Sequence, residues 1–284
     1  MVAQRPGEHF SWLLRAPAGK RATIGLIVLN VLVFGVQKTR GAGLLSDLNL
    51  GAMQGVHVHA GEPWRLVTAC FLHGGVLHLA FNMLALYGFL GLVEEYAGSA
   101  AALCIYLLTG AAGFAMTAYF QPVVTSLGAS GAINGAIGVT LCIYAQRYGG
   151  IRALYTHPAC VSLLVQLVFW TWFSIRTGSN VDHYAHGGGF ALGLVIGWAL
   201  TDNSPLVSRL APVLVATAAM LYVGCFPPQP PAPAEVRSAL SYGALYTGAL
   251  KDDRGGVTLQ PARGRKLLSY ACRCGDSIAC DLML

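Results

Sequence analysis

Long apolar stretches separated by short polar segments run through most of the chain. Spanning a hydrocarbon core of about 30 Å takes about 20 mostly apolar residues, and a helix can cross it because its backbone hydrogen bonds are satisfied internally. Stretches of helical length occur at residues 22–36, 66–93, 100–120, 128–145, 159–175, 183–200 and 210–226. This pattern predicts an all-α polytopic membrane protein with a six-helix core and a seventh transmembrane helix.

The amino-acid composition also indicates a membrane protein. Hydrophobic residues make up 55% of the chain and charged residues 11%, whereas soluble domains carry roughly a quarter charged residues. Between Arg65 and Arg147 the only formal charges are Glu94 and Glu95. Nucleic acid is excluded as a partner, because binding it requires a dense basic face.

The distribution of basic residues favours a cytoplasmic N-terminus, because cytoplasmic loops carry the excess of Lys and Arg. The cytoplasmic segments then hold Arg5, Arg15, Lys20, Arg21, Arg147, Arg152 and Arg209, and the outer segments hold Lys38, Arg40, Arg65 and Arg176. The first apolar stretch could also belong to a signal peptide, but no small-residue cleavage pattern follows it, which favours a retained anchor. We expect a cytoplasmic segment at 1–21, a membrane core at 22–200, the seventh helix at 201–226 and a tail at 227–284 that opens with a proline-rich spacer.

The eight cysteines divide with this topology. Four fall in or beside the predicted helices, where cysteine commonly packs as a small apolar residue. The other four, Cys225, Cys272, Cys274 and Cys280, would lie on the outer side. In an oxidising compartment these thiols could form two disulfides of unknown pairing, and a metal site is the alternative.

Two predicted helices begin with residues suited to chemistry. Ser130 and Gly131 start the fourth stretch, where unpaired backbone N–H groups and the helix dipole can stabilise an oxyanion. His186 starts the sixth and shares one face with Gly189, Gly193 and Gly197. If this face packs on Gly131 and Gly135, His186 comes near Ser130 and can act as its base. The alternatives are a small-residue packing face for the serine and a structural role for the histidine.

The second stretch contributes a third polar group. His78 and Asn82 are four residues apart and share a helix face, so both can donate hydrogen bonds to one point. Such donors suit an oxyanion, although a hydrogen bond that only joins two helices is the alternative. His73 points elsewhere and is expected to fix the entrance of this helix.

The remaining polar residues have simpler interpretations. Without further information, Trp64 and Arg65 are expected to be interfacial anchors. Glu94 and Glu95 are expected at a solvated cytoplasmic edge, and His57 and His59 as exposed residues of the loop before Trp64.

Together these motifs resemble the rhomboid family of intramembrane serine proteases. The resemblance covers roughly residues 20 to 200 and rests on motifs in the family's order: Trp64 and Arg65; His73, His78 and Asn82; Gly128, Ser130 and Gly131; His186, Gly189 and Gly193. It implies that Ser130 is the nucleophile and His186 its general base, and that His78, Asn82 and backbone N–H groups from Gly128 to Ser130 hold the oxyanion. Clients would be transmembrane proteins in the lipid bilayer, and no cofactor or metal is implied.

The sequence departs from the family pattern at Asn134, where an aromatic residue commonly stacks on the catalytic histidine. Asn134 could instead donate a hydrogen bond to His186, and Asp182 is expected to be a helix N-cap rather than a third catalytic residue. The rival functions are a catalytically silent rhomboid-like protein that binds transmembrane clients, and a histidine-based transporter or metal-handling protein. We expect a bacterial cytoplasmic membrane, with the active site opening to the outer side. The sequence leaves the oligomeric state open.

Overall fold

A computed structural model describes residues 19–41, 43–177, 181–202, 205–226, 249–251, 257–259, 261–276 and 280. The predicted cytoplasmic segment up to residue 18 and the proline-rich spacer lie outside these ranges. The long helices are α1 (Arg21–Thr39), α5 (Val76–Ala97), α6 (Ser99–Phe120), α7 (Ser130–Arg147), α9 (Pro158–Thr177), α10 (His183–Thr201) and α11 (Leu206–Cys225). They occur at the predicted stretches, so the all-α fold is confirmed.

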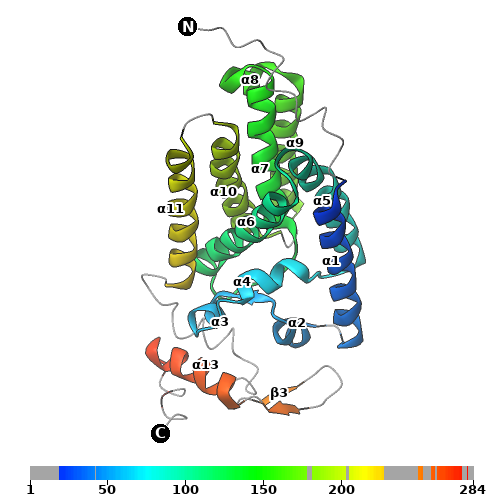
Figure 1. Ribbon diagram of the computed structural model, residues 1–284. Coiled ribbons are helices and arrows are strands. Elements are labelled where there is room, and N and C mark those ends of the chain that lie inside the picture. The colour runs from blue at the N-terminus through cyan, green and yellow to red at the C-terminus, as the bar shows by residue number, and fades with distance from the viewer. Residues whose placement is uncertain are drawn as a thin grey trace.

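The helices form a bundle in which α7 contacts α5, α6, α9 and α10 (Figure 1). Among the described helices, α1, α5, α6, α9 and α11 are long and apolar enough to cross a membrane. The chain is therefore an integral, multi-pass membrane protein. The glycine-rich helices α7 and α10 fall outside that set because their polar and small residues lower their hydropathy. Both pack against several neighbouring helices, so a less apolar sequence is tolerated there.

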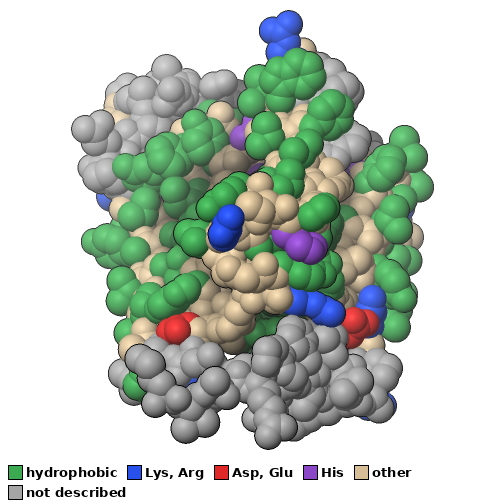
Figure 2. Space-filling model, turned by 90° about the horizontal axis from the view of Figure 1, so that it is seen from above, with side chains coloured by type: hydrophobic (Ala, Val, Ile, Leu, Met, Phe, Trp, Pro, Cys, Tyr) green, Lys and Arg blue, Asp and Glu red, His purple; other side chains and the backbone are tan. Residues whose placement is uncertain are grey.

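The side of the bundle carries the large apolar residues. Exposed examples are Leu77 and Leu84 on α5, Val168 on α9 and Val215 on α11. Viewed from the end that carries α8 (Ala153–Thr156), hydrophobic side chains line the left and right flanks and the few charged side chains are scattered (Figure 2). This distribution suits a surface surrounded by lipid.

The second predicted stretch is interrupted, which corrects the expectation of one helix over 66–93. Residues Arg65–Thr68 form the short helix α4 and Ala69–Phe71 the 3-10 helix η2. The chain is then extended at Leu72 and Gly75 before α5 begins at Val76. His73 consequently lies in the connection before the helix that carries His78.

The connection between α1 and α5 is folded. It contains α2 (Leu44–Leu50), β1 (Met53–Gln54) and α3 (Gly55–His59). β1 pairs antiparallel with β2 (Thr125–Ser126), which lies shortly before α7. This pairing ties the connection to the segment that leads into Ser130.

Arg65 is fully buried, so the expectation of an interfacial anchor is wrong for this residue. Its Nε donates to Glu62 Oε2 at 2.5 Å and its Nη1 donates to the Ala52 carbonyl at 2.6 Å. Trp64 is 46% exposed, and the Arg65 guanidinium lies 4.7 Å from its ring centroid. His57, expected to be exposed, is also fully buried, with its Nδ1 3.5 Å from Glu62.

Glu94 is fully buried as well, which corrects its expected place at a solvated edge. Its carboxylate accepts hydrogen bonds from the backbone N–H groups of Ala22 and Thr23 at 2.9 and 2.8 Å, and from the Ser99 hydroxyl at 2.6 Å. It therefore satisfies the unpaired donors in the first turn of α1. Glu95 pairs with Lys20 at 3.4 Å.

Part of the C-terminal tail is described. β3 (Ala249–Lys251) pairs antiparallel with β4 (Val257–Leu259), and α13 (Pro261–Arg273) follows. Cys272 bonds to Cys280, while Cys225 and Cys274 are free thiols. The hypothesis of two disulfides among these four cysteines is therefore wrong, because only the Cys272–Cys280 disulfide forms among them.

His59 of α3, which was also expected to be exposed, contacts both the tail and the end of α11. Its Nδ1 lies 3.1 Å from the Tyr270 hydroxyl and its Nε2 lies 3.0 Å from the Gly224 carbonyl. Burial lowers the pKa of His59 to about 4. The neutral ring can then donate to the carbonyl and accept from the tyrosine.

Candidate active site

Ser130 and His186 lie in contact at the beginnings of two neighbouring helices. Ser130 is the first residue of α7, and His186 lies in the first turn of α10. The His186 Nε2 is 2.8 Å from the Ser130 Oγ. A histidine at this distance can accept the serine proton.

Glycines allow this approach. A Cβ atom on Gly189 would lie 2.1 Å from the Gly131 carbonyl oxygen, and one on Gly193 would lie 2.1 Å from the Gly135 carbonyl oxygen. Real Cβ atoms do not approach backbone atoms so closely. The helices α7 and α10 can therefore pack at this separation only with glycine at positions 189 and 193. The predicted contact between the two glycine faces is confirmed.

Asp182 caps α10. Its side chain accepts a hydrogen bond from the Ala185 N–H at 2.9 Å, which confirms the predicted N-cap. The Thr117 hydroxyl on α6 also donates to this carboxylate at 2.7 Å. The sequence analysis missed Thr117, because a threonine in a continuous apolar helix carries no local signal of its partner.

Replacing Asp182 with asparagine is expected to change the cleavage rate by less than about tenfold, because asparagine caps helices about as well as aspartate. The measurement is the cleavage rate of a transmembrane substrate, beside the thermal unfolding temperature. Thr117→Val, which removes the second donor to Asp182, is the matched control. A roughly thousand-fold or larger loss of rate in Asp182→Asn, with the unfolding temperature unchanged, would identify Asp182 as a catalytic acid instead.

His78 and Asn82 face the space beside Gly128. A Cβ built on Gly128 would lie 3.0 Å from the His78 Nε2 and 3.9 Å from the Asn82 Nδ2. The Gly74 N–H donates to the His78 Nδ1 at 3.3 Å. The proton of a neutral His78 ring is then on Nε2, which is free to donate toward this space. Gly74 is a second residue that the sequence analysis missed, since it acts through its backbone.

The backbone N–H of Gly128 was predicted to be an oxyanion donor, but the structure gives it another partner. Its N–H already donates to the Ala69 carbonyl at 2.9 Å. Its φ of +128° is a conformation that favours glycine, and its missing side chain leaves room for His78 and Asn82. The backbone N–H groups of the first turn of α7, starting at Ser130, remain available as donors.

Asn134 does not form a hydrogen bond with the His186 imidazole in the described part of the chain. Its Nδ2 donates to the Ser130 carbonyl at 2.9 Å, within α7. The hypothesis that it replaces aromatic stacking by a hydrogen bond to His186 is therefore wrong. The short amide side chain finds its partner one turn back on its own helix.

His73 packs beside His78. Their ring centroids are 5.2 Å apart. The backbone N–H of His73 donates to the Gln37 side-chain oxygen at 3.1 Å. His73 is fully buried. Burial, followed by the nearby His78, lowers the pKa of His73 to about 4, so this ring is neutral at physiological pH.

Ser130 and His186 line a cavity of ≈ 940 Å³ together with His78 and Asn82. Its lining comes from α5, α7, α10 and the segments that precede α7 and α10, and includes His78, Asn82, Ser126, Ser130, Asp182 and His186. The volume is within the range of substrate pockets. The described residues include no group of three or more His, Cys, Asp or Glu side chains that could hold a metal ion.

Comparison with known proteins identifies the family. Residues 60–203 match the model of the rhomboid domain, which is half of the chain. The chain belongs to the rhomboid family. The rhomboid protease GluP of Bacillus subtilis is 33% identical over 176 residues, which cover 61% of this chain and 34% of that protein. RHOMBOID-like protein 4 of Arabidopsis thaliana is 34% identical over 174 residues, 59% of this chain and 43% of that protein.

One further relative is also named as a protease. Rhomboid-like protease 5 of Toxoplasma gondii is 31% identical over 153 residues, 53% of this chain and 18% of that protein. This chain thus spans less than half the length of each of these relatives. Two of these relatives, GluP and Rhomboid-like protease 5, are named as proteases, and what this chain shares with them is similarity to the rhomboid family.

Proposed function

We propose that this protein is a serine endopeptidase that cleaves peptide bonds in or near transmembrane helices. The observation that carries the proposal is the 2.8 Å distance between Ser130 Oγ and His186 Nε2, inside a cavity of ≈ 940 Å³. Ser130 is the nucleophile and His186 the general base. No metal or organic cofactor has a part in this chemistry.

The reaction follows from the contacts of these two side chains. The His186 Nε2 accepts the hydroxyl proton while the Ser130 Oγ attacks the substrate carbonyl carbon, and the tetrahedral oxyanion forms. His186 then donates the proton to the leaving amine, and the acyl-enzyme ester remains. Water, deprotonated by His186, attacks this ester and releases the second product and the free serine.

The oxyanion is held by donors from two helices. The His78 Nε2 and the Asn82 Nδ2 supply side-chain donors, and the Ser130 N–H supplies one from the backbone. The Asn82 Nδ2 also donates to the His78 carbonyl at 2.9 Å, which fixes the amide and leaves its second hydrogen for the substrate. Gly128 contributes the open space between these groups.

Other motif residues support the site at a distance. Gly131, Gly189 and Gly193 allow α7 and α10 to approach. Arg65 stabilises the folded connection between α1 and α5 through its bonds to Glu62 and Ala52, and the Trp64 ring lies beside its guanidinium. His73 packs against His78. Asn134 fixes the first turn of α7 through the Ser130 carbonyl.

We propose that the active site opens to the outer side of a bacterial cytoplasmic membrane. Ser130 and His186 lie at the end of the bundle opposite α8, near which Arg147 and Arg152 lie. The Cys272–Cys280 disulfide belongs to the tail that contacts α3 at the active-site end, and disulfides persist in oxidising compartments. Residues 22–200 form the protease core in this proposal, with residues 201–226 as the seventh helix and residues 227–284 as an outer appendage.

A client-binding protein without activity is the second candidate. The observation in its favour is Asn134, which stands where the family commonly has an aromatic residue and whose amide donates to the Ser130 carbonyl. The retained Ser130 and His186 pair argues for the protease.

The proposal is tested by labelling with a fluorophosphonate, which reacts with activated serines, and by cleavage of a helix-weakened transmembrane substrate. We expect the wild-type protein to cleave the substrate and to be labelled at Ser130, as located by peptide mapping. Ser126→Ala is the matched control, because Ser126 lines the same cavity, and this variant should keep both labelling and cleavage. A folded wild-type protein that is neither labelled nor active, yet binds transmembrane clients, would support the second candidate.

A further inference from the structure

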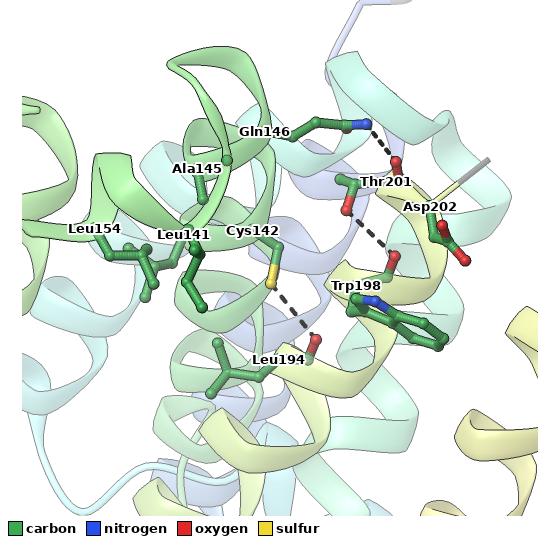
Figure 3. A pocket seen from close by; sticks show the side chains of 11 residues that line it. Leu141, Cys142, Ala145, Gln146, Leu154, Leu194, Trp198, Thr201 and Asp202 are labelled. Carbon is green, nitrogen blue, oxygen red and sulfur yellow. Dashed lines mark hydrogen bonds between the residues drawn. The ribbon is translucent and has the colours of Figure 1, made fainter. Parts of the chain in front are cut away.

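A second cavity lies at the other end of α7 and α10, away from Ser130 and His186. Its volume is ≈ 380 Å³, which is within the range of sites that hold small ligands. It is an open pocket, lined by the last turns of both helices, by η3 (Gly150–Arg152) and by α8 (Figure 3). Its walls are mainly apolar, with Leu141, Leu154, Leu194 and Trp198 among the residues that line it.

Three polar side chains of the walls have hydrogen-bond partners within the protein. The Cys142 thiol donates to the Leu194 carbonyl at 3.5 Å, and the Gln146 amide donates to the Thr201 carbonyl. The Thr201 hydroxyl donates to the Gly197 carbonyl at 2.9 Å. Because these three side chains have partners and most of the remaining lining is apolar, the cavity is suited to an apolar occupant.

The position of the cavity relative to the membrane suggests the source of that occupant. α7 ends at Arg147 and α10 at Thr201, so the helix ends mark the membrane surface on this side. Trp198 is 46% exposed and lies one turn before the end of α10, and tryptophan is enriched at the level of the lipid headgroups. The cavity is therefore at the depth where lipid acyl chains begin.

Two basic residues are adjacent in sequence to residues that line the same cavity. Arg152 is exposed and directly follows Gly150 and Ile151, which line the cavity, and Arg147 directly follows Gln146. Within the described ranges, Arg152 forms no ion pair. The one acidic residue of the lining, Asp202, has Arg209 beside it, whose Nη1 donates to the Asp202 carbonyl at 3.0 Å. The surroundings therefore favour an anionic group.

We propose that this cavity binds one acyl chain of a membrane phospholipid, whose phosphate is held by Arg152 with Arg147 nearby. The apolar walls accept the chain, and the arginines accept the negative charge that the phosphate carries. This site is separate from the proposed catalytic site and does not depend on protease activity.

Native mass spectrometry of the full chain in detergent, with phosphatidylglycerol added, tests the proposal. We expect one lipid to remain bound to the wild-type protein. Ala145→Phe fills the cavity and should lower retention by about tenfold or more, equivalent to about 1.4 kcal/mol. Arg152→Gln removes one charge and should lower retention by about fivefold. Val165→Phe on the exposed surface of α9 is the matched control and should retain the lipid.

Diacylglycerol with the same acyl chains serves as a probe that lacks the phosphate, and should bind the wild type about as weakly as phosphatidylglycerol binds Arg152→Gln. Equal retention of phosphatidylglycerol by the wild type, by Ala145→Phe and by Arg152→Gln would overturn the proposal. A dimer that survives lipid removal and dissociates in Ala145→Phe would also overturn it, in favour of a second copy at this surface. Arg152→Gln keeps the test decisive if Ala145→Phe does not fold, because Arg152 is exposed and its substitution fills no internal space.

Discussion

Replacing Ser130 with alanine is expected to reduce the cleavage rate of a transmembrane substrate by roughly 10⁴- to 10⁶-fold, because the proposed acyl-enzyme forms on the Ser130 Oγ, which alanine lacks. His186→Ala should have an effect of similar size, since without the base at 2.8 Å the hydroxyl is a weak nucleophile. The two residues act as a unit, so the double variant should lose little more than either single variant. The measurement is the cleavage rate at saturating substrate in liposomes.

The controls for this prediction separate chemistry from folding. Ser126→Ala and His183→Ala remove a serine and a histidine close to the catalytic pair, and should keep most of the activity. Thermal unfolding temperatures of all variants should stay close to that of the wild type. Activity that survives in Ser130→Ala would rule out Ser130 as the nucleophile, whatever the result for His186→Ala.

Replacing Gly189 with alanine is expected to destabilise the protein by about 3 kcal/mol or more and to abolish most of the cleavage. The added methyl group would lie 2.1 Å from the Gly131 carbonyl oxygen, and the obstacle is backbone rather than a flexible side chain. α7 and α10 must then separate, which exceeds the usual cost of overpacking and moves His186 away from Ser130. The measurements are the thermal unfolding temperature and the cleavage rate.

Gly187→Ala is the matched control for the glycine prediction. Gly187 lies on the same helix two residues earlier, and a Cβ there would meet nothing within 4 Å. Alanine at this position should be neutral or slightly stabilising, because it is the better helix former. If Gly189→Ala is as stable and active as Gly187→Ala, close packing of α7 on α10 does not hold the catalytic pair together.

Several parts of the site were predictable from sequence because they depend on spacing within a few helical turns. Gly189 and Gly193 follow His186 at intervals of three and four residues, so their common face is determined before any partner is known. The same reasoning places His78 and Asn82 on one side of α5. Asp182 is recognisable as a cap because its bond partner, the Ala185 N–H, is three residues away.

Other features depended on partners distant in the chain. Glu94 looks like a solvated edge until the start of α1, 71 residues earlier, supplies the Thr23 N–H. Arg65 looks like an anchor until the folded connection covers it. The pairing of Cys272 with Cys280 rather than with Cys274 or Cys225 is likewise a matter of which thiols the tail brings together.

The amino-acid sequence was enough to predict the membrane class, the positions of the long helices, the rhomboid resemblance and the faces that carry Ser130 and His186. These follow from apolar length and helical periodicity, which are local properties of the chain. Four features became visible only in the folded protein. They are the break before α5, the donation of the Gly128 N–H to the Ala69 carbonyl, the bond of Asn134 to its own helix, and the cavity at the far end of α7 and α10. Each of these depends on the groups that packing brings within a few ångströms, and the free energy of burying a polar group depends on whether such a partner is present.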